Sequence, residues 1–114
     1  MNLKHTFNVA INWPLKPKNE SENKKIYRKS HQILINGKPE IIASAAKAFK
    51  GDASLYNPED LLLSSLTSCH MMSYLYCCDI NKIEIISYTD TSEAILEVLA
   101  NGSGKITEVV LNPI

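Results

Sequence analysis

The chain of 114 residues predicts a single α+β domain in which three strands, one long helix and three further strands follow one another. Short segments alternate between apolar and polar residues, glycine-containing turns separate them, and a long apolar segment in the middle opens with a helix-start signal. The apolar fraction of 45% is enough for one core but leaves a small margin of stability, so a partner subunit could contribute further cover.

Three strands are expected before the helix. Residues 3–13 alternate apolar and polar side chains, and Pro14 ends this first strand. After a polar segment that we interpret as a solvated loop, residues 26–35 and 39–45 form the next two strands. Asn36-Gly37 between them is a strong hairpin signal, because both residues accept positive φ.

The helix is the clearest element in the sequence. Asn57 can cap it, Pro58 suits its first position, and Glu59 and Asp60 favour the positive end of the helix dipole. The helix then continues to about Cys78, with apolar groups on almost every face and only small polar residues between them. Such a helix is expected to be buried on all sides.

Three more strands are expected after the helix, at residues 82–90, 93–100 and 105–112, with Asn101 to Gly104 as the turn of the last hairpin. The predicted architecture is one sheet wrapped on a long central helix, in βββ-α-βββ order. Because one sheet covers only one side of a helix, something else must cover the other side.

The net charge, the lack of long apolar runs and the cysteine count exclude several classes of protein. Twelve Lys and Arg residues balance twelve Asp and Glu residues, which excludes a general basic surface for nucleic acid. No apolar run approaches the roughly 18 to 20 residues that span a bilayer, and the first residues contain no apolar block like that of a signal peptide. Three cysteines within ten positions form no secreted disulfide framework, so we expect a reducing cytoplasm.

Cys69 is the first candidate for chemistry. A reactive cysteine needs its thiolate, and Cys69 lies about three turns from the helix start, too far for the helix dipole to help much. A separate cation is required, and Arg28 is the one arginine in the chain. The alternatives stay open at this point: Cys69 as a small hydrophobic core residue, and Arg28 as a surface residue of a strand.

Cys77 and Cys78 follow Cys69 by eight and nine residues, about 12 Å or more along a helix. Disulfide geometry needs Cα atoms roughly 4.4 to 6.8 Å apart, so neither can bond to Cys69 in the same intact helix. We interpret both as core residues. Together with His70 the three cysteines match no usual zinc spacing, and we expect no metal site.

The helix residues resemble a known family. Tyr56 to Leu63 (YNPEDLLL), followed by Ser64 to Met72 (SSLTSCHMM), closely resembles the central-helix signature of the OsmC/organic hydroperoxide resistance family. Tyr88-Thr89-Asp90, the Gly-rich hairpin and Thr107 to Pro113 are similar to the strands that follow in that family. The resemblance implies an OsmC-like fold, an intertwined homodimer, and a peroxidase without a cofactor that reduces organic hydroperoxides, and less well hydrogen peroxide, in oxidative stress defence.

The resemblance also implies roles for residues. Cys69 matches the cysteine that attacks the peroxide, Glu59 the glutamate, and Arg28 the arginine that holds the thiolate. Glu59 and Cys69 are ten residues apart, about 15 Å on a straight helix, so one arginine can hardly contact both within one subunit. We therefore expect a homodimer with a shared active site. Candidate apolar walls of the substrate pocket are Leu62, Leu66, Met72 and Tyr76.

The chain departs from the family after its last expected strand. Family members continue with a second helix, which carries the resolving cysteine, and a further strand. Residues 1–114 show no match to these elements, so we interpret them as one OsmC-like domain that lacks both. An external thiol would then have to reduce the sulfenic acid of Cys69. The alternative is a catalytically incomplete OsmC-like dimeric module that keeps the fold without the reaction cycle.

Overall fold

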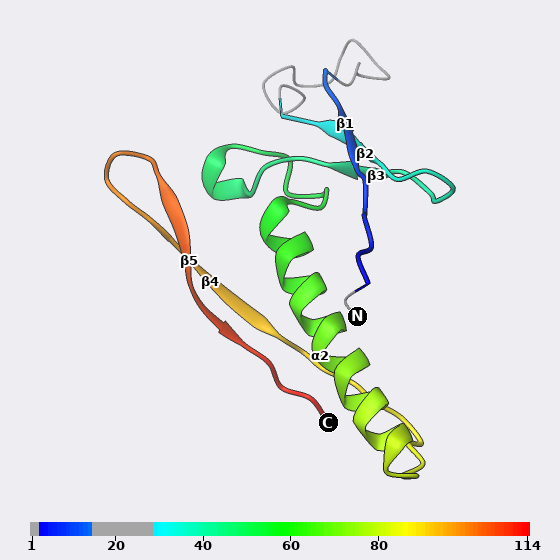
Figure 1. The fold of residues 1–114 in the computed structure, drawn as a ribbon. Coiled ribbons are helices and arrows are strands. Elements are labelled where there is room, and N and C mark those ends of the chain that lie inside the picture. The colour runs from blue at the N-terminus through cyan, green and yellow to red at the C-terminus, as the bar shows by residue number, and fades with distance from the viewer. Residues whose placement is uncertain (1–2, 15–28) are drawn as a thin grey trace. The chain divides into compact units, whose positions relative to one another are not determined.

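The structure is a computed structural model that describes residues 3–14 and 29–114, and Figure 1 shows its ribbon. The chain forms two compact units, residues 1–58 and 59–114. None of the helices in the described ranges is both long and apolar enough to cross a membrane.

The first unit contains a three-stranded antiparallel sheet. Its strands are β1 (Ala10–Asn12), β2 (His31–Leu34) and β3 (Ile41–Ala43), in the order β1-β2-β3. The strands are shorter than predicted because β2 offers backbone partners only opposite residues 10–12, so the rest of segment 3–13 forms no ladder. Residues 26–28 of the second predicted strand lie outside the described residues.

The turn between β2 and β3 forms where Asn36-Gly37 predicts it. The amide of Lys38 donates to the carbonyl of Ile35 at 3.0 Å, and Gly37 has a φ of +80°. Asn36 is not among the described residues with positive φ, so glycine alone takes the left-handed position. This is the pattern of a type II turn, which demands Gly at its second central residue.

A tight loop closes the first unit and includes the short 3-10 helix η1 (Lys47–Phe49). Ser44 is fully buried: its amide donates to the carbonyl of Tyr56 at 2.8 Å, and its Oγ accepts from the amide of Asp52 at 3.0 Å. A Cβ on Gly51 would lie 1.9 Å from the carbonyl oxygen of Ala45. The loop therefore needs glycine for close approach of two backbone segments.

Helix α2 (Pro58–Ile80) begins where the sequence predicts it and ends two residues beyond the predicted end. At its C-terminus Lys82 adopts a left-handed φ of +57°, and the amide of Ile83 donates to the carbonyl of Cys78 at 2.8 Å. These bonds satisfy carbonyls that the last helical turn leaves free.

Two antiparallel strands, β4 (Glu93–Val98) and β5 (Gly104–Val110), follow the helix and form a hairpin that Figure 1 shows. The strand predicted at residues 82–90 is not formed, and the prediction of six strands in one sheet is wrong in this respect. Residues 83–88 have no strand partner in the described part of the chain, although each strand of the two-stranded β4–β5 sheet keeps one unpaired edge. Beyond it, a bridge between Asp90 and Pro113 and two backbone hydrogen bonds between Thr89 and Ile114 join the chain to its C-terminal segment.

The α+β class with one long helix is confirmed, but α2 is not enclosed on all sides. Cys78 is its one buried residue. A stripe of four half-buried residues and the buried Cys78 runs along one face with a spacing of three or four positions, which is the helical repeat. Its members are Leu63, Thr67, Met71, Leu75 and Cys78. The apolar residues on the opposite face are exposed, because the segment before β4 packs on one face only.

Candidate functional site

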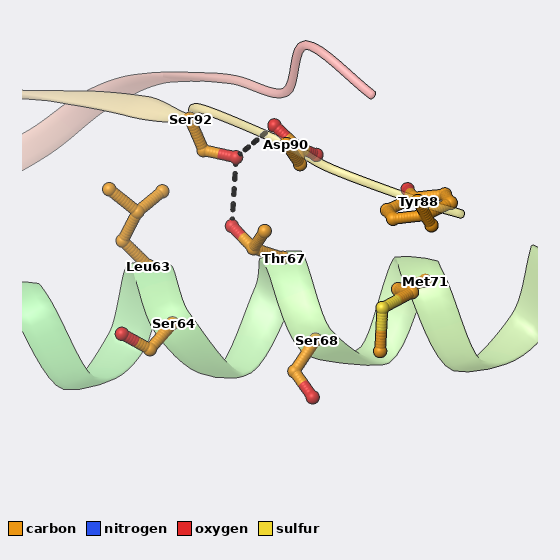
Figure 2. Close-up of a pocket in the computed structure, with 8 residues that line it drawn as sticks. All are labelled: Leu63, Ser64, Thr67, Ser68, Met71, Tyr88, Asp90 and Ser92. Carbon is orange, nitrogen blue, oxygen red and sulfur yellow. Dashed lines mark hydrogen bonds between the residues drawn. The ribbon is translucent and has the colours of Figure 1, made fainter. Parts of the chain in front are cut away.

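An open groove of about 470 Å³ lies in the second unit, between α2 and the segment that leads into β4 (Figure 2). Hydroxyl-bearing side chains dominate its lining, and one carboxylate and two apolar side chains complete it. The lining residues are Leu63, Ser64, Thr67, Ser68, Met71, Tyr88, Asp90 and Ser92.

A chain of hydrogen bonds fixes one wall of this groove, as Figure 2 shows. Thr67 Oγ1 donates to Ser92 Oγ at 2.9 Å, and Ser92 Oγ donates to Asp90 Oδ1 at 2.8 Å. The same Oδ1 accepts from the amide of Asn112 at 2.9 Å. Because both hydroxyl protons are committed to acceptors and no histidine joins the chain, this wall is built for rigidity and not for nucleophilic attack.

The second oxygen of Asp90, Oδ2, is shielded from water and has no hydrogen-bond partner. An unpartnered carboxylate oxygen in such a position is costly, since burial removes its hydration. The hydrogen bonds that Asp90 contributes to the stability of the fold are therefore those accepted by its other oxygen, Oδ1. Asp90 joins the helix to the C-terminal segment through that single atom.

An aromatic cluster continues from the groove along α2. The Tyr88 hydroxyl lies 3.2 Å from Nδ1 of His70, within hydrogen-bond distance, and the Tyr74 and Tyr88 rings are 5.7 Å apart. A hydrogen bond with the Cys78 thiol raises the pKa of Tyr74. Desolvation, and after it the charge of Asp90, raises the pKa of Tyr88. Both phenols are therefore neutral near pH 7, and Cys78 is engaged in packing and hydrogen bonding.

Cys69 is an exposed free thiol in the middle of α2. It does not line the groove, and neither does any of the four predicted pocket residues. Those four, Leu62, Leu66, Met72 and Tyr76, are exposed on the helix. The structure thus separates two sides of α2: a polar groove on one, and Cys69 among exposed apolar side chains on the other. The predicted pocket lining stays a prediction.

Glu59 lies in the first turn of α2, ten residues before Cys69 and about 15 Å from it along the helix axis. One of its carboxylate oxygens, Oε2, is shielded from water and has no hydrogen-bond partner. Arg28 lies outside the described residues, so its predicted pairing stays a prediction. Among residues 3–14 and 29–114, no three His, Cys, Asp or Glu side chains gather in a way that could hold a metal ion.

The Thr67–Ser92–Asp90 chain was not predicted from the sequence. Hydroxyl residues at 67 and 92 are unremarkable in composition, and their contact joins positions 25 residues apart. The available signal was Asp90 two residues before Ser92, a spacing typical of side chains that organise a turn.

Comparison with known proteins supports the family indicated by the helix motif. No protein-family model matches the chain, and no curated protein matches it in sequence. A solved structure of an OsmC-like protein of unknown function from Vibrio cholerae is similar to it, with a TM-score of 0.78 and 25% identity over 97% of this chain and 74% of that one. The fold and the helix motif thus define an OsmC-like α+β protein. The chain is therefore similar to OsmC-like proteins in its fold and in its helix motif.

Proposed function

We propose that this chain reduces organic hydroperoxides through Cys69. The observation that carries the proposal is the place of that thiol: it is reduced and exposed, in the middle of the long helix of an OsmC-like fold. The helix carries no charged residue between Asp60 and Asp79, so a peroxide that approaches Cys69 meets an apolar surface. Three free cysteines also suit a reducing compartment such as the cytoplasm.

The proposed reaction has two steps. The Cys69 thiolate attacks one oxygen of the peroxide, the O–O bond breaks, and the leaving alkoxide takes a proton to become an alcohol. Cys69 is left as a sulfenic acid. A thiol then attacks the sulfenic sulfur, water leaves, and a disulfide forms that further thiol reduces.

Glu59 and Arg28 are proposed to activate Cys69. The unpartnered Oε2 of Glu59 needs a donor, and a guanidinium provides several in a fork that fits a carboxylate. Arg28 is the one arginine of the chain and keeps its charge at any working pH. In this proposal Glu59 is a positioning residue that orients Arg28, and Arg28 holds Cys69 as a thiolate and stabilises the leaving alkoxide.

The proposal includes a homodimer, because about 15 Å separates Glu59 and Cys69 along one helix. Large apolar side chains around Cys69 support it: Leu62, Leu66 and Tyr76 are 47%, 42% and 66% exposed. A face of this kind suits both an apolar peroxide and a second subunit.

The test is intact mass after one equivalent of cumene hydroperoxide in the presence of dimedone, which traps sulfenic acids. We expect one adduct on Cys69, and none in the Cys69→Ser variant. Cys78→Ala is the matched control, because it removes a thiol from the same helix and should keep the adduct. A folded wild-type sample without any adduct would contradict the proposal and favour a non-catalytic OsmC-like module.

A further inference from the structure

One face of α2 has Ser73 at its centre and no partner within the second unit. We name it the Ser73 face and define it by Leu66, Cys69, Ser73, Cys77 and Ile80, all of which are exposed. Except for Ile80, its residues lie in the charge-free part of the helix between Asp60 and Asp79. Its two thiols are the exposed ones, whereas the third, Cys78, is buried.

The Ser73 face is self-complementary. Cys69 and Cys77 each lie four positions from Ser73, about 40° to either side of it around the helix. Leu66 and Ile80 each lie seven positions away, about 20° to either side. If a second copy packs antiparallel with the two-fold axis at Ser73, Leu66 of one copy meets Ile80 of the other, and Cys69 meets Cys77. Each contact then occurs twice, as an isologous interface requires.

We infer that a second copy of this chain packs on the Ser73 face, and that its Cys77 resolves the Cys69 sulfenic acid as a disulfide between subunits. The redox part of this inference rests on the proposed peroxidase function. The packing part rests on the absence of charge, the exposed apolar residues and the symmetric pairing of the two thiols.

The geometry allows such a bond. Helix axes pack 8 to 10 Å apart, and serine at the crossing point allows a separation of about 9 Å. With axes about 9 Å apart and Cα atoms at a radius of about 2.3 Å, the two Ser73 Cα atoms lie about 4.4 Å apart, and Cys69 and the opposing Cys77 have their Cα atoms about 6 Å apart. This separation falls within the roughly 4.4 to 6.8 Å that a disulfide needs.

The other thiols of the helix are excluded as partners. Within one chain, Cys77 lies about 12 Å from Cys69 along the axis, too far for a disulfide. Cys78 is 7% exposed and hydrogen-bonded to Tyr74 on the opposite face. Two copies of Cys69 would lie about 12 Å apart along an antiparallel pair centred on Ser73, so they cannot bond to each other.

The chemical step balances. The Cys77 thiol of the second copy loses its proton, its sulfur attacks the Cys69 sulfenic sulfur, and the S–OH bond breaks. The departing hydroxide takes the proton and leaves as water. The peroxide is the oxidant that was reduced in the preceding step, and both thiols of the pair end at the disulfide level.

The test mixes two variants, Cys69→Ser and Cys77→Ser, and adds cumene hydroperoxide without a reductant. Only a dimer of one chain of each variant places a Cys69 opposite a Cys77. We therefore expect a covalent dimer in the mixture and none in either variant alone. Wild type should give a covalent dimer with two bonds, and Cys78→Ala should behave like wild type. Chymotrypsin cleaves after Tyr74 and Tyr76, which puts Cys69 and Cys77 on different peptides for mapping.

Dimedone separates the two possible failures. A dimedone adduct on Cys69 without a covalent dimer in the mixture would overturn the inference and leave the proposed function intact. If no sulfenic acid forms, the proposed function fails, and diamide, which couples neighbouring thiols without a peroxide, still tests the packing. A lack of the Cys69–Cys77 bond with diamide would overturn the inference independently.

Discussion

At the residue scale, Gly51 allows two backbone segments of the first unit to approach closely. Its neighbour across the loop is the backbone of Ala45, not a side chain that could move. Gly37 and Gly102 differ from it: both have positive φ, and nothing lies within 4 Å of the place where a Cβ would stand. Gly51 is needed because there is no room for a Cβ, whereas Gly37 and Gly102 are needed because their φ angles are positive.

Replacing Gly51 with alanine should therefore destabilise the first unit more than the same change at Gly37. An added Cβ at Gly51 overlaps backbone atoms, which we expect to cost about 3 kcal/mol, because the loop has to shift. At Gly37 the cost should be about 1 kcal/mol for a side chain at positive φ. Urea unfolding of both variants measures the difference. Equal losses would show that the loop can move apart at Gly51 without penalty.

At the scale of the element, α2 presents two different faces in one sequence of apolar and small residues. The face with Leu63, Thr67 and Met71 packs towards the segment before β4, where Thr67 donates to Ser92. The face with Cys69 has no such partner in its unit. The helix is apolar on almost every face, which is typical of a helix buried on all sides. Its own unit buries only one of these faces.

Asp90→Ala should loosen the link between α2, the segment before β4 and the C-terminal segment. It removes the acceptor of Ser92 Oγ and of the Asn112 amide, so we expect the free energy of unfolding to fall by about 2 kcal/mol. Asp90→Asn keeps an oxygen at that place and should lose less. Denaturant unfolding measures both variants, and an Asp90→Ala protein as stable as wild type would show that the chain of hydrogen bonds contributes nothing.

At the scale of the whole molecule, the chain has two small sheets and a helix with an exposed apolar face, so much apolar surface stays in contact with water. A two-stranded hairpin such as β4–β5 is marginal without further packing. Exposed side chains on the helix, together with Phe7 and Ile11 in the first unit, are 42% to 91% exposed in the isolated chain. Association between chains is the direct way to remove such surface from water.

Ser73→Glu should convert the inferred dimer into monomers, because it would set two like charges against each other at the inferred two-fold axis. Ser68→Glu is the matched control: the same change on the same helix, about 140° away from Ser73. Sedimentation velocity should give a monomer for the first and a dimer for the second. A dimeric Ser73→Glu protein would place the interface elsewhere.

The α+β class, the start of α2 at Pro58, the turn at Gly37 and the β4–β5 hairpin all follow from local sequence signals. Capping residues, glycine at turns and apolar repeats act over a few positions, so a reader of the sequence can recover them. The resemblance to the OsmC-like fold was also within reach, since the helix motif is a continuous segment.

Only the tertiary structure decided the rest. Residues 83–88 have the pattern of a strand but pair with no other strand, and a strand exists only through its partner. The Thr67–Ser92–Asp90 chain and the division of α2 into a polar groove and an apolar Cys69 face likewise depend on residues distant in sequence. Periodicity shows that a side chain shares a face with its neighbours, whereas packing decides what that face meets.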